Sequence, residues 1–96
     1  MSSPFQERMK VLRQAFAASL GPDVEEALGL LRAGDRHEAA ALIHQIAGRA
    51  GTFGAPLVSE AASRIEQMLP HGSVDELEAA FADLIEASGT AVERQP

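Results

Sequence analysis

A regular series of helix start and stop signals divides this sequence, and it restricts the possible folds more than any other feature. Ser3-Pro4 and Asp35 have the pattern of helix N-termini, whereas Gly34 has the position of a C-terminal cap. Between such signals, apolar residues recur every three or four positions, which is the period of an amphipathic helix. Nowhere do β-branched residues show the two-residue alternation of a strand. The sequence therefore predicts an all-α protein.

Five helices are expected, and the interruption at Gly21-Pro22 separates the first from the second. Their approximate ranges are 4–20, 22–33, 35–52, 56–69 and 73–88. Because the connections are only a few residues long, successive helices are expected to run antiparallel. We predict one domain over residues 1–96, an up-and-down antiparallel four-helix bundle with an additional N-terminal helix packed on it.

Composition and charge exclude several classes of function. Asp and Glu number 14 against 8 Lys and Arg, a net charge of -6, which argues against binding nucleic acid or an anionic membrane surface. The absence of cysteine excludes a disulfide framework, a thiolate nucleophile and a cysteine-ligated zinc site. No apolar run approaches the roughly 18 residues of a membrane span, so a cytoplasmic protein is expected.

His44 lies in the middle of the helix expected over 35–52, and a helical wheel indicates the direction of its side chain. With about 100° per residue, the buried arc of this helix is centred nearly opposite His44. It is formed by Ala39, Leu42, Ile43, Ile46, Ala50 and Phe53. The imidazole is therefore expected to face outward rather than into the core. A metal site is not expected, since His37 on the same face is roughly 10 Å away along the axis.

Small residues surround His44 on this outer face, namely Ala40, Ala47, Gly48 and Gly51. Glycine in a helix interior costs about 1 kcal/mol relative to alanine, so both glycines need an explanation. Gly48, four residues after His44, would clear space for a group on the ring or for a partner surface; the alternative is close helix packing. Gly51 either contributes to the same space or loosens the helix end.

The stretch from His44 to Gly54 resembles the signature of the histidine-containing phosphotransfer (HPt) domain of bacterial two-component phosphorelays. That signature is a helical H-x-L-K-G-x-[AS]-x-x-[LF]-G, and the sequence here is HQIAGRAGTFG. Gly34-Asp35 before this helix, and Ala62, Ile65 and Glu66 after it, also resemble the family. The resemblance thus spans most of the chain, including its length and helix count.

What the resemblance implies is a phosphocarrier without kinase activity of its own, with His44 as the phosphoryl acceptor between receiver-domain aspartates. The expected partners are response-regulator receiver domains and a hybrid histidine kinase, with this chain acting as a monomer. The receiver would supply Mg²⁺, so no cofactor is expected here. The alternative function is a helical adaptor that binds receiver or kinase domains without transferring phosphate.

Two positions around His44 qualify this resemblance. The family usually has a lysine three residues after the histidine, where this chain has Ala47, and Arg49 lies about 140° away around the helix. The family also often has a polar residue on the next helix that hydrogen-bonds the inner ring nitrogen, and Glu66 matches that position. Glu66 is thus either the residue that fixes the histidine tautomer or a solvated charge on the helix flank.

Overall fold

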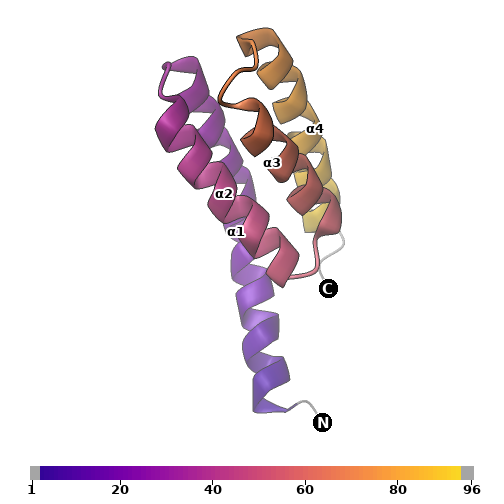
Figure 1. Ribbon diagram of the computed structural model, residues 1–96. Coiled ribbons are helices and arrows are strands. Elements are labelled where there is room, and N and C mark those ends of the chain that lie inside the picture. Colours follow the sequence, from indigo (N-terminus) through magenta and orange to yellow (C-terminus); the bar gives the residue numbers. More distant parts are fainter. Residues whose placement is uncertain (1–2, 94–96) are drawn as a thin grey trace.

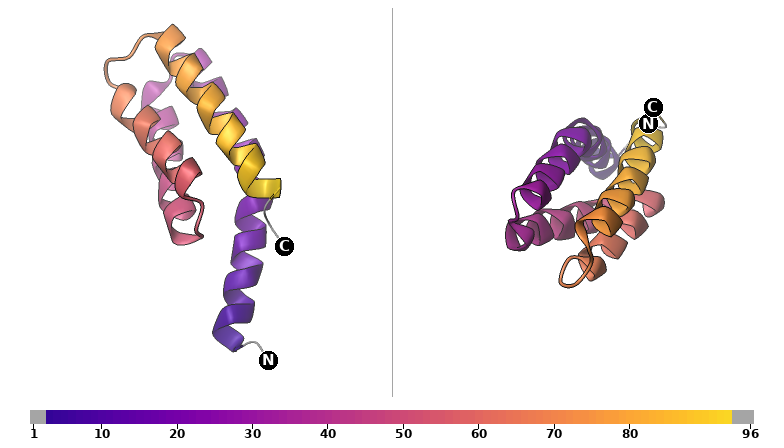
Figure 2. Two further views of the ribbon diagram at one scale, coloured as in Figure 1. Left: turned by 90° about the vertical axis from the view of Figure 1, so that its right-hand side faces the viewer. Right: turned by 90° about the horizontal axis from the view of Figure 1, so that it is seen from above.

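The computed structural model describes residues 3–93, which form four helices joined by short turns (Figure 1). These are α1 (Pro4–Arg32), α2 (Arg36–Thr52), α3 (Pro56–Met68) and α4 (Val74–Glu93). Successive helices run antiparallel, and each packs on two neighbours around a square, in the order α1, α2, α3, α4 (Figure 2). The prediction of an all-helical bundle is confirmed over the described residues, where there is no strand.

The prediction of a separate, additional N-terminal helix is wrong, because α1 continues through Gly21-Pro22 without a break. Proline fixes φ near the helical value and removes one backbone donor, so a helix can pass through it when packing compensates. Pro22 is exposed, whereas the apolar stripe on the opposite side stays in phase across it. The buried members of that stripe are Phe16, Leu20, Val24, Ala27, Leu28 and Leu31. The bundle therefore uses the second part of α1 as its first helix.

The other helices lie close to the ranges expected from the sequence, except that α4 is longer. Helices α2 and α3 each start or end within one residue of their expected limits. Helix α4 continues to Glu93 instead of ending near residue 88, and Ala91 packs against the core along this extension. Residues 1–2 and 94–96 of the expected domain lie outside the described residues.

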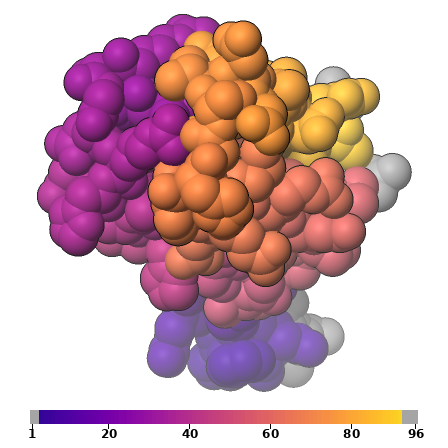
Figure 3. Space-filling view, turned by 45° about the horizontal axis from the view of Figure 1, so that its top comes forward, coloured from indigo at the N-terminus to yellow at the C-terminus, as the bar shows by residue number. Residues whose placement is uncertain are grey.

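The first part of α1, residues 4–15, projects beyond the bundle (Figures 1 and 3). The molecule measures 50 × 21 × 19 Å, and this projecting segment accounts for much of its length. Buried residues of α1 begin only at Phe16, whose ring lies 5.6 Å from that of Phe53 at the end of α2. The Phe16–Phe53 contact thus marks the base of the bundle, where the projecting segment leaves it.

A mainly aliphatic core fills the bundle and fixes the register of the four helices. Its largest fully buried side chains are Phe81, Leu20, Ile43, Ile46, Ile65, Leu69, Leu77, Leu84, Val24 and Val58. Tight turns join the first three helices, and each uses a glycine with positive φ, Gly34 at 83° and Gly54 at 76°. Next to the first turn, the Asp35 side chain accepts a hydrogen bond from the Glu38 backbone N–H at 3.1 Å and so caps α2.

Candidate functional site

His44 lies on the outer face of α2, with its ring directed away from the core. Ala39, Ile43, Ile46 and Ala50 on the opposite face of α2 are all buried, as the helical wheel predicts. The His44 side chain is 75% exposed, so another molecule can reach its ring. The sequence-based direction of this side chain is therefore confirmed, and the possibility of a core histidine is excluded.

Glu66 on α3 contacts the ring of His44 from the neighbouring helix. Its Oε2 lies 2.7 Å from His44 Nδ1, within hydrogen-bond distance. Because α3 is buried through Val58, Ala62 and Ile65, the carboxylate is held at the α2–α3 seam and projects toward α2. The sequence left Glu66 as either a partner of the histidine ring or a solvated charge, and the structure shows the contact with the ring. This contact leaves Nε2 on the exposed side of the ring.

Two small residues flank His44 along α2, one helical turn to either side. Ala40 lines a shallow depression that includes Glu66, whereas Gly48 lines an open depression together with His44 itself. A Cβ built on Gly48 would meet nothing within 4 Å. Close packing of helices therefore does not explain Gly48, which leaves open space beside the imidazole.

Ala47 and Gly51 lie at the edge of the site that faces α3. The backbone oxygen of Ala47 accepts a hydrogen bond of 3.2 Å from the Ser59 hydroxyl, and a Cβ on Gly51 would lie 3.7 Å from that same oxygen of Ser59. Ser59 thus ties α3 to α2 one turn beyond His44. The methyl group of Ala47 is half-buried and brings no charge to the histidine.

Arg49 is the basic residue nearest to His44 in the sequence, and its guanidinium is directed toward α1. Its Nη1 lies 3.5 Å from Asp23 Oδ2, at the outer limit of hydrogen-bond distance. Arg49 does line the same open depression as His44. The structure therefore brings His44, Glu66, Gly48 and Ala40 together, and holds Arg49 at the rim on the α1 side.

Comparison with protein-family models gives a match that covers most of the chain. The model of the Hpt domain matches residues 11–94, which include all of α2 and α3. The chain belongs to the Hpt domain family. An Hpt domain takes part in two-component phosphorelays, where such domains interact with receiver domains and histidine kinases. Comparisons with curated proteins and with solved structures gave no match.

Ser59 and Asp23 are the two residues of this Hpt domain that sequence analysis missed. Their partners, Ala47 and Arg49, are 12 and 26 positions away in the sequence, so no helical periodicity connects them. Ser59 has one weak signal, since it is a polar residue that follows the buried Val58 on α3. Only the packing of α3 and α1 on α2 brings these groups to the site.

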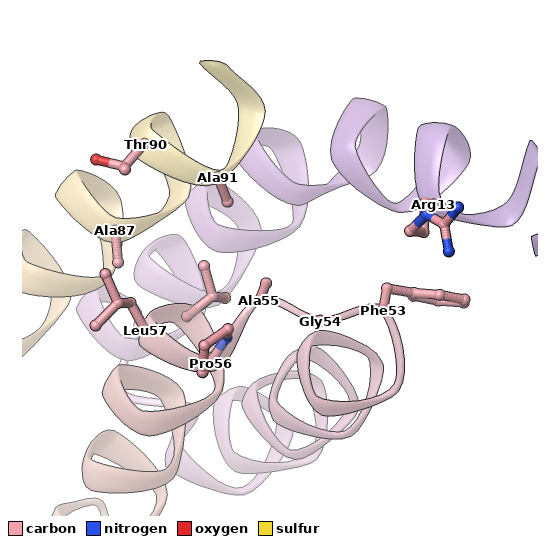
Figure 4. Close-up of a pocket in the computed structure, with 10 residues that line it drawn as sticks. Arg13, Phe53, Gly54, Ala55, Pro56, Leu57, Ala87, Thr90 and Ala91 are labelled. Atoms are coloured by element: carbon pink, nitrogen blue, oxygen red, sulfur yellow. The ribbon is translucent and has the colours of Figure 1, made fainter. Parts of the chain in front are cut away.

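Leu57 lines neither of the two depressions around His44. It is exposed on α3 and lines a depression with Ala87 and Thr90 of α4 (Figure 4). Within residues 3–93, no three side chains of His, Cys, Asp or Glu gather closely enough to hold a metal ion. In the same range, no helix has the length and apolarity to cross a membrane.

Proposed function

We propose that His44 carries a phosphoryl group between the aspartates of receiver domains. The observation that supports this most directly is the 2.7 Å contact between His44 Nδ1 and Glu66 Oε2 on an exposed ring. In a neutral imidazole, one ring nitrogen carries hydrogen and the other carries the lone pair. When Nδ1–H donates to the carboxylate, the lone pair is on Nε2, which is the nitrogen that an incoming phosphoryl group can reach.

The transfer step follows from this tautomer. The Nε2 lone pair of His44 attacks the phosphorus of an aspartyl phosphate, the bond between phosphorus and the aspartate oxygen breaks, and the aspartate leaves as a carboxylate. The ring keeps its Nδ1 hydrogen and gains a positive charge, which the Glu66 carboxylate stabilises at short range. The second transfer reverses these bond changes on another receiver domain and returns His44 to its neutral form.

The receiver supplies the remaining catalytic groups in this proposal, including its Mg²⁺ ion. The sequence has neither a P-loop nor a glycine-rich nucleotide fingerprint, which agrees with a carrier that does not phosphorylate itself from ATP. Ala47 contributes no charge and Arg49 is paired with Asp23, so the cation that neutralises the phosphoryl oxygens would come from the partner. Binding partners are then receiver domains and a hybrid histidine kinase.

The test is transfer of labelled phosphate from a receiver domain phosphorylated on its aspartate. His44→Gln is expected to abolish labelling with an unchanged circular dichroism spectrum, whereas the control His71→Gln, at another exposed histidine, retains it. Label on the unmodified chain should be acid-labile and base-stable, as for phosphohistidine. Undiminished labelling of the His44→Gln variant would refute the proposal.

A second candidate function is a helical adaptor that binds receiver domains without transferring phosphate. The neutral Ala47 beside His44 favours this alternative, because it leaves the phosphoryl oxygens without a cation from the carrier itself. Stable binding of a phosphorylated receiver together with no label on the unmodified chain would identify the adaptor. Labelling at His44 would exclude it.

A further inference from the structure

The projecting segment of α1, residues 4–15, has an apolar stripe that the bundle does not cover. Phe5, Met9 and Leu12 follow one another at helical spacing and continue the line of the buried Phe16. Phe5 is 68% exposed and Leu12 is 43% exposed. The capping box formed by Ser3 and Gln6 lies just before this stripe, so the segment begins with a capped helix N-terminus.

This segment is also the most basic part of an acidic chain. Arg8, Lys10 and Arg13 are three of the 8 basic residues in the chain, and Glu7 is the one acidic residue between positions 3 and 15. On a helical wheel, Arg8 and Arg13 lie on opposite sides of the apolar stripe. The segment thus has an apolar centre with a positive charge on each flank, of which Arg13 is half-buried beside the bundle.

A groove of complementary character lies between α3 and α4. It is lined by the apolar residues Leu57, Ala61 and Ala87 and by three acidic residues, Glu60 on α3 and Asp83 and Glu86 on α4. One basic residue, Arg64, also lines it, with its guanidinium 3.9 Å from the Glu60 carboxylate, so the groove is acidic on balance. At the end of the groove nearest the base of the bundle, the Leu57 side chain is 57% exposed. Leu57, Ala87 and Thr90 also line the depression at the base of the bundle, which reaches Phe53 and Arg13 (Figure 4). The depression lined by Glu60, Asp83 and Glu86 is the α3–α4 groove, and the depression at the base continues from it toward Arg13 of the same chain.

Within its own chain, the projecting segment reaches only the depression at the base of the bundle, through Arg13, and no residue of α1 lines the α3–α4 groove. Helix α1 is continuous, and its second part is fixed in the core from Phe16 to Leu31, so the first part points away from the bundle (Figure 2). The matching groove must belong to another molecule. We propose that residues 4–15 of α1 form a dimerisation segment whose apolar stripe binds the α3–α4 groove of a second copy of this chain.

The charge of the chain favours this occupant. Two copies of a protein with a net charge of -6 repel each other, and contact is favoured where a basic segment of one meets an acidic groove of the other. If each copy donates its segment to the other, the interface is isologous and closes as a two-fold dimer. Sequence analysis predicts a monomer, and this proposal differs from that prediction.

This dimer leaves the candidate phosphorylation site accessible. His44 and Glu66 lie at the seam between α2 and α3, whereas the proposed interface uses the seam between α3 and α4, the adjacent side of the square. Each dimer would present two copies of His44. The inference does not depend on phosphoryl transfer, so the two proposals can fail separately.

The experiment is sedimentation equilibrium of the full chain between about 1 and 200 µM at low salt, with the Phe5→Asp/Leu12→Asp double variant beside it. We expect dimers of the unmodified chain that dissociate as salt is raised, and at least a tenfold weaker association of the double variant. Val74→Asp, at an exposed apolar position at the opposite end of the bundle, is the matched control and should dimerise normally. Equal melting temperatures would show that the variants remain folded.

A charge exchange tests whether the groove is the contact. Asp83→Lys/Glu86→Lys should weaken association, and mixing this variant with an Arg8→Glu/Arg13→Glu variant should restore heterodimers. A chain that stays monomeric at 200 µM would overturn the proposal, as would dimers that are unaffected by the Phe5→Asp/Leu12→Asp change. Burial of the segment only when a receiver domain is added would also overturn it in favour of that partner.

Discussion

Glu66 Oε2 lies 2.7 Å from His44 Nδ1 across the seam between α2 and α3, and this contact defines the chemistry of the exposed face. The two residues are 22 positions apart in the sequence. One belongs to the helix that presents the reacting ring, the other to the helix that fixes its tautomer. The helices are held together by Ile43 and Ile46 of α2 and Ile65 of α3, all fully buried.

Replacing Glu66 tests the role of this contact. Glu66→Ala removes the acceptor for Nδ1–H, so phosphoryl transfer to His44 should slow on the order of tenfold, because the ring loses its orientation and preferred tautomer. Glu66→Gln keeps an amide oxygen that can accept from Nδ1–H, and it should retain more of the rate. The measurement is the initial rate of labelling by a phosphorylated receiver. Glu60→Ala, at an exposed acid on the same helix, is the control, and an equal loss there would count against the assignment.

Substitutions at Gly48 distinguish an effect on docking from an effect on stability. Since a Cβ at this position meets nothing within 4 Å, Gly48→Ala should raise the free energy of unfolding by about 0.5–1 kcal/mol through helix propensity alone. Gly48→Gln should fold equally well but slow transfer, since its side chain fills the space beside His44. Urea denaturation and transfer kinetics measure the two effects. Normal kinetics in Gly48→Gln would show that the open space is not required.

Pro22 in the interior of α1 is a site where a substitution should stabilise the fold. Alanine restores the backbone donor that proline lacks, and Pro22 is exposed, so the side-chain change costs no core packing. We expect Pro22→Ala to raise the free energy of unfolding by about 1–3 kcal/mol in urea. Lower stability would instead indicate that the bundle needs the proline at this point of α1.

The ion pair between Arg32 at the end of α1 and Glu78 on α4 predicts a pH dependence of stability. Arg32 Nε and Nη2 donate to the two carboxylate oxygens at 3.0 and 2.8 Å, and these hydrogen bonds lower the pKa of Glu78 below its ordinary value of 4.5. A carboxylate with a lowered pKa in the folded state stabilises the fold above its unfolded pKa. That contribution is lost as pH falls through the lowered folded value.

Thermal unfolding from pH 7 to pH 3 checks this contribution. The unmodified chain should lose more stability below about pH 4.5 than Glu78→Gln, because the variant has no carboxylate to protonate. Arg32→Gln should reduce the acid sensitivity in the same way, and the double variant should show no further change. An identical pH profile in all four proteins would exclude a role for the pair.

The sequence by itself determined the ranges of α2 and α3 to within one residue and the direction of His44. Local periodicity sets which side of a helix is apolar, so the buried arc through Ile43 and Ile46 already directs His44 outward. The glycine pattern likewise indicated the open space at Gly48. The family resemblance came from the same short segment, which is why it could be recognised without a structure.

Only the tertiary structure decided what lies around His44 and how α1 is used. The breaking tendency of Gly21-Pro22 is a local signal, and it was overridden because Leu20 and Val24 pack on one core from both sides of it. The contact of Glu66 with His44, the direction of Arg49 and the groove between α3 and α4 all depend on which helices become neighbours. That arrangement arises from the summed burial of apolar side chains from four helices, which no single segment of the sequence contains.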